Sequence, residues 1–155
     1  MLRISKMTDY GTVVMTHLAK HPDRHSSARE LAEELDIGMA TVSKILKILE
    51  RANLLSAQRG KNGGYRLVRS PDEVSVAEVI RAMEGPIALT ECASDLVRCE
   101  QEDSCTVQSN WQRINRAILQ ALERVTLTDM NQSISEKGVA SDTLTFYREP
   151  NKAAL

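Results

Sequence analysis

The stretch SSARELAEELDIGMATVSKILKILERANLLSAQRGKNGGYRLV, residues 26–68, decides the fold of this chain. Its first part predicts two short helices joined by a tight turn that ends in Gly38. Ser26 or Ser27 can cap the first helix, because Glu30 follows at the spacing of a capping box. The apolar stripes comprise Leu31, Ala32 and Leu35 in the first helix, and Val42, Ile45, Leu46 and Leu49 in the second. This pattern is typical of a helix-turn-helix.

A β-hairpin follows the helix pair directly. Residues 53–59 and 65–68 read as two short strands around the turn Gly60-Lys61-Asn62-Gly63-Gly64. A helix-turn-helix followed at once by a hairpin is a winged helix. The expected fold class is therefore mainly α, with a two-stranded wing.

Further helices flank this unit. They are expected over residues 4–19, 74–83, 106–125 and 128–134, and residues 135–155 read as a polar, mobile tail. Aromatic residues make up only 3% of the chain, which favours packed helices with an aliphatic core. We expect a winged helix-turn-helix domain over 1–84, a cysteine-containing loop over 85–106, a dimerisation helix and short C-terminal helix over 107–134, and the tail over 135–155.

The long helix carries an apolar seam. Ile114, Ile118, Leu122 and Val125 follow one another at steps of four, four and three residues, as in a coiled coil. The seam can pack on its own chain or form a dimer interface. We favour the dimer, because helix-turn-helix proteins commonly bind paired half-sites.

Positive charge is concentrated in one block, although the net charge of the chain is −1. Residues 40–69 hold seven basic side chains and one acidic side chain, a local net charge of +6, whereas residues 86–155 hold seven basic and ten acidic side chains. A solvated helix face is the ordinary explanation of a charge run, but helices normally mix signs. The block favours binding to nucleic acid.

Within this block, the second helix of the pair is the expected recognition helix. Its early outward residues are suited to base edges and its later ones to phosphates. Arg59 stands at a glycine-rich wing turn, where an arginine can enter a narrow minor groove. The candidate DNA-binding residues are Ala40, Thr41, Ser43, Lys44, Lys47, Arg59 and Lys61.

Three cysteines, Cys92, Cys99 and Cys105, are the only ones in the chain. Clustered thiolates favour a soft metal or an iron–sulfur cluster. Their spacing lacks the paired CxxC of a common zinc site, so zinc is neither indicated nor excluded. Nearby acidic residues disfavour free thiolates, unless a metal supplies opposing charge. Three unligated surface cysteines are the alternative.

Several other classes of protein are disfavoured. The chain has no apolar run long enough to span a membrane, and its first residues lack the apolar core of a signal peptide. We therefore expect a cytoplasmic protein with reduced thiols. The absence of a CxxC pair, a phosphate-binding glycine loop and a supported Ser/His/Asp set argues against an enzyme.

Taken together, these motifs resemble the IscR/NsrR/RirA family of winged-helix transcription regulators over roughly residues 1–134. The resemblance lies in residues 7–10, 41–44, 59–65 and 76–80 and in the three cysteines. It implies a homodimer built on the long helix and an iron–sulfur cluster bound by Cys92, Cys99 and Cys105. It also implies a minor-groove role for Arg59 and base-edge contacts from residues 40–44.

The residue expected as the fourth ligand of the cluster differs from that of one branch of the family. In the IscR branch a histidine follows the third cysteine by three residues, and here that position is Gln108. In the NsrR branch an aspartate near the N-terminus, contributed across the dimer, is the ligand, and Asp9 occupies the corresponding position. We predict Asp9, an exchangeable oxygen ligand. The expected cluster is of the 2Fe–2S or the 4Fe–4S type.

The resemblance is closest to regulators of SUF-type iron–sulfur assembly. It implies a repressor that binds a double-stranded DNA operator and senses iron–sulfur status or oxidative or nitrosative stress. The alternatives are a nitric-oxide- or iron-responsive repressor of the same family, and a zinc-bound or metal-free regulator that senses another signal.

Overall fold

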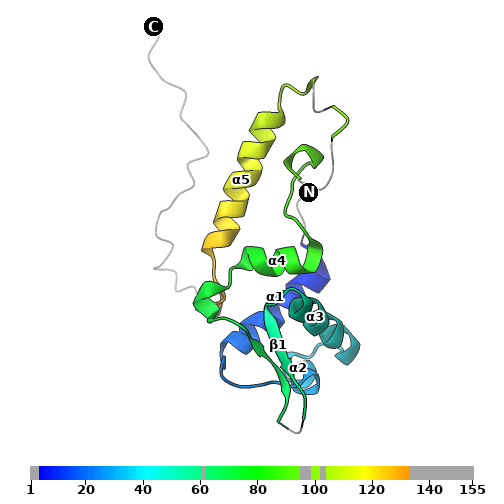
Figure 1. Cartoon of the computed structure of the whole chain (residues 1–155), viewed down its shortest axis with the longest axis vertical. Coiled ribbons are helices and arrows are strands. Elements are labelled where there is room, and N and C mark those ends of the chain that lie inside the picture. Colours follow the sequence, from blue (N-terminus) through cyan, green and yellow to red (C-terminus); the bar gives the residue numbers. More distant parts are fainter. Residues whose placement is uncertain (1–3, 61, 95–98, 102–103, 133–155) are drawn as a thin grey trace.

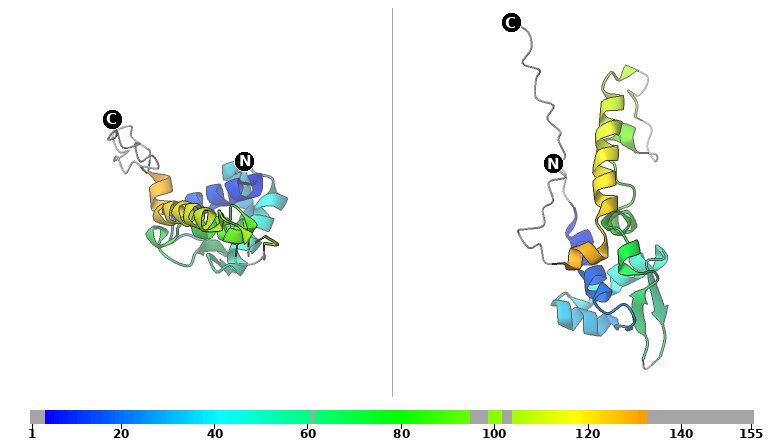
Figure 2. Two further views of the ribbon diagram at one scale, coloured as in Figure 1. Left: turned by 90° about the horizontal axis from the view of Figure 1, so that it is seen from above. Right: turned by 90° about the vertical axis from the view of Figure 1, so that its left-hand side faces the viewer.

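One helix stands out from a small helical body in the computed structural model of the chain, which describes residues 4–60, 62–94, 99–101 and 104–132 (Figure 1). The elements in chain order are α1 (Lys6–Ala19), α2 (Ala28–Leu35), α3 (Met39–Arg51), β1 (Leu55–Gln58), β2 (Gly64–Leu67), the 3₁₀ turn η1 (Pro71–Glu73), α4 (Val76–Glu84), the 3₁₀ turn η2 (Glu91–Ala93), α5 (Gln108–Arg124) and α6 (Leu127–Asn131). The wing and α5 point away from the body in opposite directions (Figures 1 and 2). The predicted winged helix-turn-helix with a long C-terminal helix is confirmed.

The helix-turn-helix consists of α2 and α3. Ser27 caps α2 and forms the complete capping box with Glu30 that the sequence predicts. The left-handed backbone of Asp36 (φ 52°) ends α2 and turns the chain toward α3. The predicted stripe of α3 is fully buried: Val42, Ile45, Leu46 and Leu49 are each 0% exposed.

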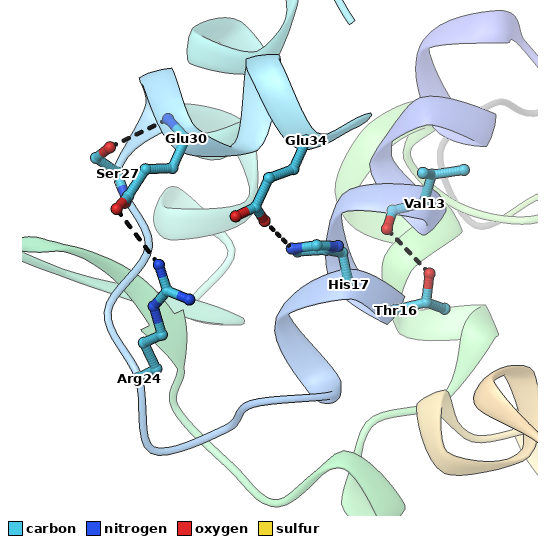
Figure 3. Close-up of polar contacts among 7 residues, drawn as sticks. All are labelled: Val13, Thr16, His17, Arg24, Ser27, Glu30 and Glu34. Carbon is cyan, nitrogen blue, oxygen red and sulfur yellow. Dashed lines mark hydrogen bonds and ion pairs between the residues drawn. The ribbon is translucent and has the colours of Figure 1, made fainter. Parts of the chain in front are cut away.

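Polar contacts fix α2 against α1 and against the loop before it. His17 Nε2 of α1 lies 2.7 Å from Glu34 Oε2 of α2, and Arg24 reaches Glu30, the capping-box residue (Figure 3). Each is a partly exposed pair of the kind that adds little stability. The buried aliphatic side chains of α1, α2 and α3 therefore provide most of the packing energy.

The wing is a single antiparallel pair of strands, β1 and β2, with Leu55 opposite Leu67 and Gln58 opposite Gly64. A further bridge joins Ser26 to Tyr65, so the wing is anchored at the entrance to α2. This approach requires Gly64: a Cβ there would lie 2.6 Å from the backbone of Ser26, and its φ is +153°.

Helix α4 closes the body against α1. Ser75 caps α4 in a second complete capping box, so the helix begins at Val76 rather than at the predicted Val74. Val74 instead accepts a backbone hydrogen bond from Leu127, which begins α6. At the other end of α4, Glu84 accepts hydrogen bonds from the Ser5 amide and the buried Thr8 hydroxyl.

The C-terminal part of the described chain returns to the body after α5. Leu127 of α6 is 0% exposed and belongs to the same core as α1–α4, and Asn131 bonds the Thr16 carbonyl. The short helix runs over Leu127–Asn131 instead of the predicted 128–134, since Gln132 caps its end, and residues 133–134 and the predicted tail over 135–155 lie outside the described residues. The division into domains stays a prediction.

Helix α5 has little of its own chain to pack on. Of its residues, all of which the structure describes, only Asn115 is buried, whereas Trp111 and Ile114 are each 40% exposed. Its apolar side lines a hollow of about 530 Å³ with residues of α4 and of the segment after it. No helix within the described residues is long and apolar enough to cross a membrane.

Candidate nucleic-acid interface and cysteine segment

The outer face of α3 carries the predicted base-contacting residues. Since its apolar stripe is buried in the core, the opposite side is left to solvent. Ala40, Lys44 and Lys47 are exposed, and Thr41 and Ser43 are half-buried. No acidic residue lies in the first turn of α3, and Gly38 makes no side-chain cap there. This helix end thus presents small polar groups, amides and positive charge, which suits it to a DNA surface.

Arg59 lies at the tip of the wing, directly after β1, and is exposed. The turn beside it depends on glycine. Gly60 has a φ of +118°, and a Cβ on Gly63 would meet the Gln58 carbonyl oxygen at 2.2 Å. The turn is therefore narrow, and Arg59 at its start is exposed. Lys61, the other predicted DNA-binding residue of the wing, lies outside the described residues.

The basic block is mostly unpaired. Within the described part of the chain, Lys44, Lys47, Arg51, Arg59 and Arg66 make no ion pair with a carboxylate. Only Arg69 of the block does so: its Nη2 lies 2.5 Å from Glu78 Oε1. The free cations follow α3 and the wing, so their charge is available to phosphates.

The cysteines lie in the segment between α4 and α5. Cys92 is in η2, and Cys99 and Cys105 follow it; all three are half-buried, free thiols. The Cys92 sulfur lies 3.2 Å from the Thr90 hydroxyl, and Cys92 borders an open groove of about 630 Å³ between α4 and α5. Among the described residues, no three His, Cys, Asp or Glu side chains are gathered as a metal site. The three cysteines are nevertheless free, partly exposed thiols, and cysteine thiolates are the usual ligands of iron–sulfur clusters.

Asp9 and Gln108 are the two positions weighed for a fourth ligand. Asp9 is exposed on α1 and lines a hollow of about 430 Å³ with Lys6, Thr12 and residues of α4 and α6. No cysteine borders that hollow. Gln108 is the first residue of α5 and is half-buried. Within one protomer, the described residues do not bring Asp9 and Cys92 into a common cavity.

Two amide side chains that are not among the predicted site residues touch the cysteine segment. Asn115 of α5 donates to the Ile87 carbonyl at 3.2 Å and accepts from the Leu89 amide at 3.0 Å. Gln112, one turn earlier, donates to the Cys92 carbonyl at 3.1 Å. The sequence holds one indication of the first. Asn115 lies four positions after Trp111, beside the apolar seam, and a coiled-coil-like pattern expects an apolar side chain at that position.

Comparison with known proteins gives one family and several related structures. Residues 4–133 match the model of the Rrf2 family, described as an iron-dependent transcriptional regulator. CymR (YrzC), the global cysteine regulator of B. subtilis, is 28% identical, with a TM-score of 0.67 over 84% of this chain and 97% of that one. IscR of T. potens is 27% identical, with a TM-score of 0.64 over 83% of this chain and 85% of that one. A Listeria innocua structure, 24% identical with a TM-score of 0.68 over 96% of each chain, shares the fold.

Proposed function

Because the chain belongs to the Rrf2 family of transcriptional regulators, we propose that it is a homodimeric, DNA-binding repressor controlled by an iron–sulfur cluster on Cys92, Cys99 and Cys105. Proteins of this family bind DNA and regulate transcription, and are not enzymes. The observation that carries the proposal is the exposed basic surface of α3 and the wing, joined through α4 to a segment with three free thiols.

On DNA, α3 enters the major groove and the wing lies along the neighbouring minor groove. The residues of α3 that contact base edges are Ala40, Thr41, Ser43 and Lys44. Lys47 and Lys61 contact phosphates, and Arg59 enters the minor groove. Their exposure and the lack of ion pairs at the described cations support this assignment.

The dimer forms through α5. A 17-residue helix whose only buried side chain is an asparagine leaves its apolar side uncovered in one protomer. Trp111 and Ile114, together with the half-buried Ile118 and Leu122, supply that surface. A second copy of α5 covers it, and two α3 helices then engage two half-sites of one operator.

In the dimer, Asp9 of the partner subunit provides the fourth ligand. Asp9 is exposed and lines a different hollow from Cys92 within one protomer, so that a partner subunit can supply it in trans. When bound, an iron–sulfur cluster supplies redox- and iron-sensitive chemistry at these thiolates. The protein's part is to hold the thiolates beside α5, so that a rearranged segment changes the spacing of the two α3 helices.

The proposed targets are iron–sulfur assembly genes of the SUF type, and the operator is double-stranded DNA. The wing and the cysteine spacing, which resemble those of such regulators, support this choice. A second candidate is a zinc-bound or metal-free regulator of the same family. The similarity to CymR, a cysteine regulator, fits this second candidate equally well.

Anaerobic purification separates the two candidates. Iron, acid-labile sulfide and zinc are counted per protomer, and the visible absorption spectrum is recorded for the wild type, for Cys92→Ala and for the control Ser104→Ala. We expect iron and sulfide in the wild type and the control, and neither in a folded Cys92→Ala dimer. Zinc alone, or no metal after reconstitution with iron and sulfide, would replace the cluster proposal by the second candidate.

A further inference from the structure

The segment between α4 and η2 is held to the protein by side chains of α5. After Gly85 and Pro86, its backbone has neither a helix nor a strand partner. Asn115 bonds both the Ile87 carbonyl and the Leu89 amide. Gln112, three residues before Asn115 and so on the same side of α5, bonds the Cys92 carbonyl. Three hydrogen bonds thus hold residues 87–92 along one turn of α5.

An asparagine is suited to this position for a chemical reason. Backbone amides and carbonyls that are partly removed from water need partners, and Asn115 itself is only 8% exposed. A carboxamide has both a donor and an acceptor, so one residue can satisfy an amide and a carbonyl of the same extended segment. A leucine there would suit the apolar seam but would leave Ile87 and Leu89 without these bonds.

The same contacts determine where Cys92 lies. Gln112 holds its carbonyl, and Thr90, within the held segment, lies against its sulfur. Of the three cysteines, Cys92 is the one whose main chain is bonded to α5 among the described contacts. The other links from α5 to the body include the partly exposed pair Arg81–Glu123, and exposed pairs are weak. The buried amide is the firmer connection.

We propose that Asn115 and Gln112 are positioning residues: they fix residues 87–92 on α5, present Cys92 in a set orientation, and transmit rearrangement of the cysteine segment to the dimer helix. This inference rests on the proposed function for its regulatory consequence. The positioning itself concerns only residues of this chain and holds in the cluster-free protein.

The first experiment uses the full-length, cluster-free, reduced protein. Alkylation of Cys92 by iodoacetamide is followed by mass spectrometry, with Cys105 as the internal reference. Loss of the part-buried hydrogen bonds of Asn115 increases local opening by about tenfold. We expect Asn115→Ala to speed alkylation of Cys92 by that factor and Gln112→Ala by a smaller one, without changing Cys105. Gln120→Ala, on the opposite side of α5 from the seam, is the matched control and should leave both rates unchanged.

Hydrogen exchange of the Leu89 amide in the same samples reports on the clamp directly. Protection should fall in Asn115→Ala and remain in Gln120→Ala. Gln112 is exposed, so Gln112→Ala leaves the core intact and keeps the test valid if Asn115→Ala does not fold. Equal Cys92-to-Cys105 alkylation ratios in the wild type and Gln112→Ala, or equal Leu89 protection in the wild type and a folded Asn115→Ala, would overturn the proposal.

The second experiment uses anaerobically reconstituted protein and measures the rate at which iron is lost to a chelator. We expect loss to be several-fold faster from Asn115→Ala and Gln112→Ala than from the wild type and Gln120→Ala. If wild-type protein takes up no cluster, the cluster proposal fails while the alkylation result still decides the positioning role. If all four proteins lose iron at the same rate, the two amides do not position Cys92 in the loaded protein, and the cluster proposal stands.

Discussion

Thr8→Val tests the junction between the start of α1 and the end of α4, next to the cysteine segment. The Thr8 side chain is fully buried, and its hydroxyl donates to Glu84 Oε1 at 2.6 Å. Valine has nearly the same shape but lacks the hydroxyl, so it removes this bond and the 3.1 Å contact of the hydroxyl with Ser5 Oγ. Hydrogen bonds to charged groups contribute about 1.5–3 kcal/mol, and the exposed position of Glu84 favours the lower end. We expect a loss of about 1.5 kcal/mol, or roughly 3–6 °C in melting temperature for a chain of this size.

The loss should depend on pH in a defined direction. The Thr8 hydroxyl, and next the Ser5 amide, lower the pKa of Glu84 from its ordinary 4.5. Because the folded-state pKa is the lower one, this stabilisation is complete above about pH 4.5 and is lost as the pH falls through the folded-state pKa. The difference between the wild type and Thr8→Val should therefore be constant near neutrality and should shrink in acid.

Urea unfolding followed by circular dichroism, at one protein concentration and across pH, measures this difference. Thr12→Val is the matched control, because its hydroxyl bonds only the Thr8 carbonyl one turn back. We expect the control to change stability by less than about 0.5 kcal/mol, with no pH dependence. An equal effect of the two substitutions near neutrality, or a Thr8→Val effect that persists unchanged in acid, would refute the reasoning.

Three further predictions concern the DNA surface and the dimer. Arg59→Ala should weaken specific operator binding by about 1–3 kcal/mol in a fluorescence anisotropy titration, and unchanged affinity would remove the wing tip from the interface. Gly64→Ala should lower the free energy of unfolding by about 2 kcal/mol or more, because the added Cβ would meet the Ser26 backbone at 2.6 Å. Thermal unfolding measures this loss, and a stability equal to that of the wild type would show that the base of the wing can shift freely. Ile118→Glu, which puts a charge into the apolar seam, should turn the dimer into monomers, whereas Gln120→Glu should not. Sedimentation velocity measures this, and a dimeric Ile118→Glu protein would place the interface elsewhere.

The winged helix was predictable because local signals and burial agree along residues 26–68. The capping box at Ser27, the turn at Asp36 and the buried stripe of α3 are each encoded within a few residues. The start of α4 was placed two residues early, because Val74 is apolar but lies in an extended link bonded to Leu127, a contact distant in sequence. Periodicity alone does not reveal such a partner.

The site was less predictable, because its contacts depend on packing. The sequence indicates Cys92 as a ligand by residue type, yet only the fold reveals that Gln112 holds its carbonyl. Asn115 was not among the predicted site residues, and its partners, Ile87 and Leu89, lie more than twenty residues away in the sequence. The period of the seam can mark Asn115 as out of place, but it does not identify partners so distant in sequence.

The most direct test of the central claim compares operator affinity with and without the cluster. Wild-type protein is divided into cluster-loaded and cluster-free samples, and both are titrated with the same labelled operator, without oxygen and at one salt concentration. We predict that the two dissociation constants differ by about tenfold or more, within the usual range of coupling between two sites. Equal dissociation constants for a loaded sample with verified iron and sulfide would contradict control of DNA binding by the cluster.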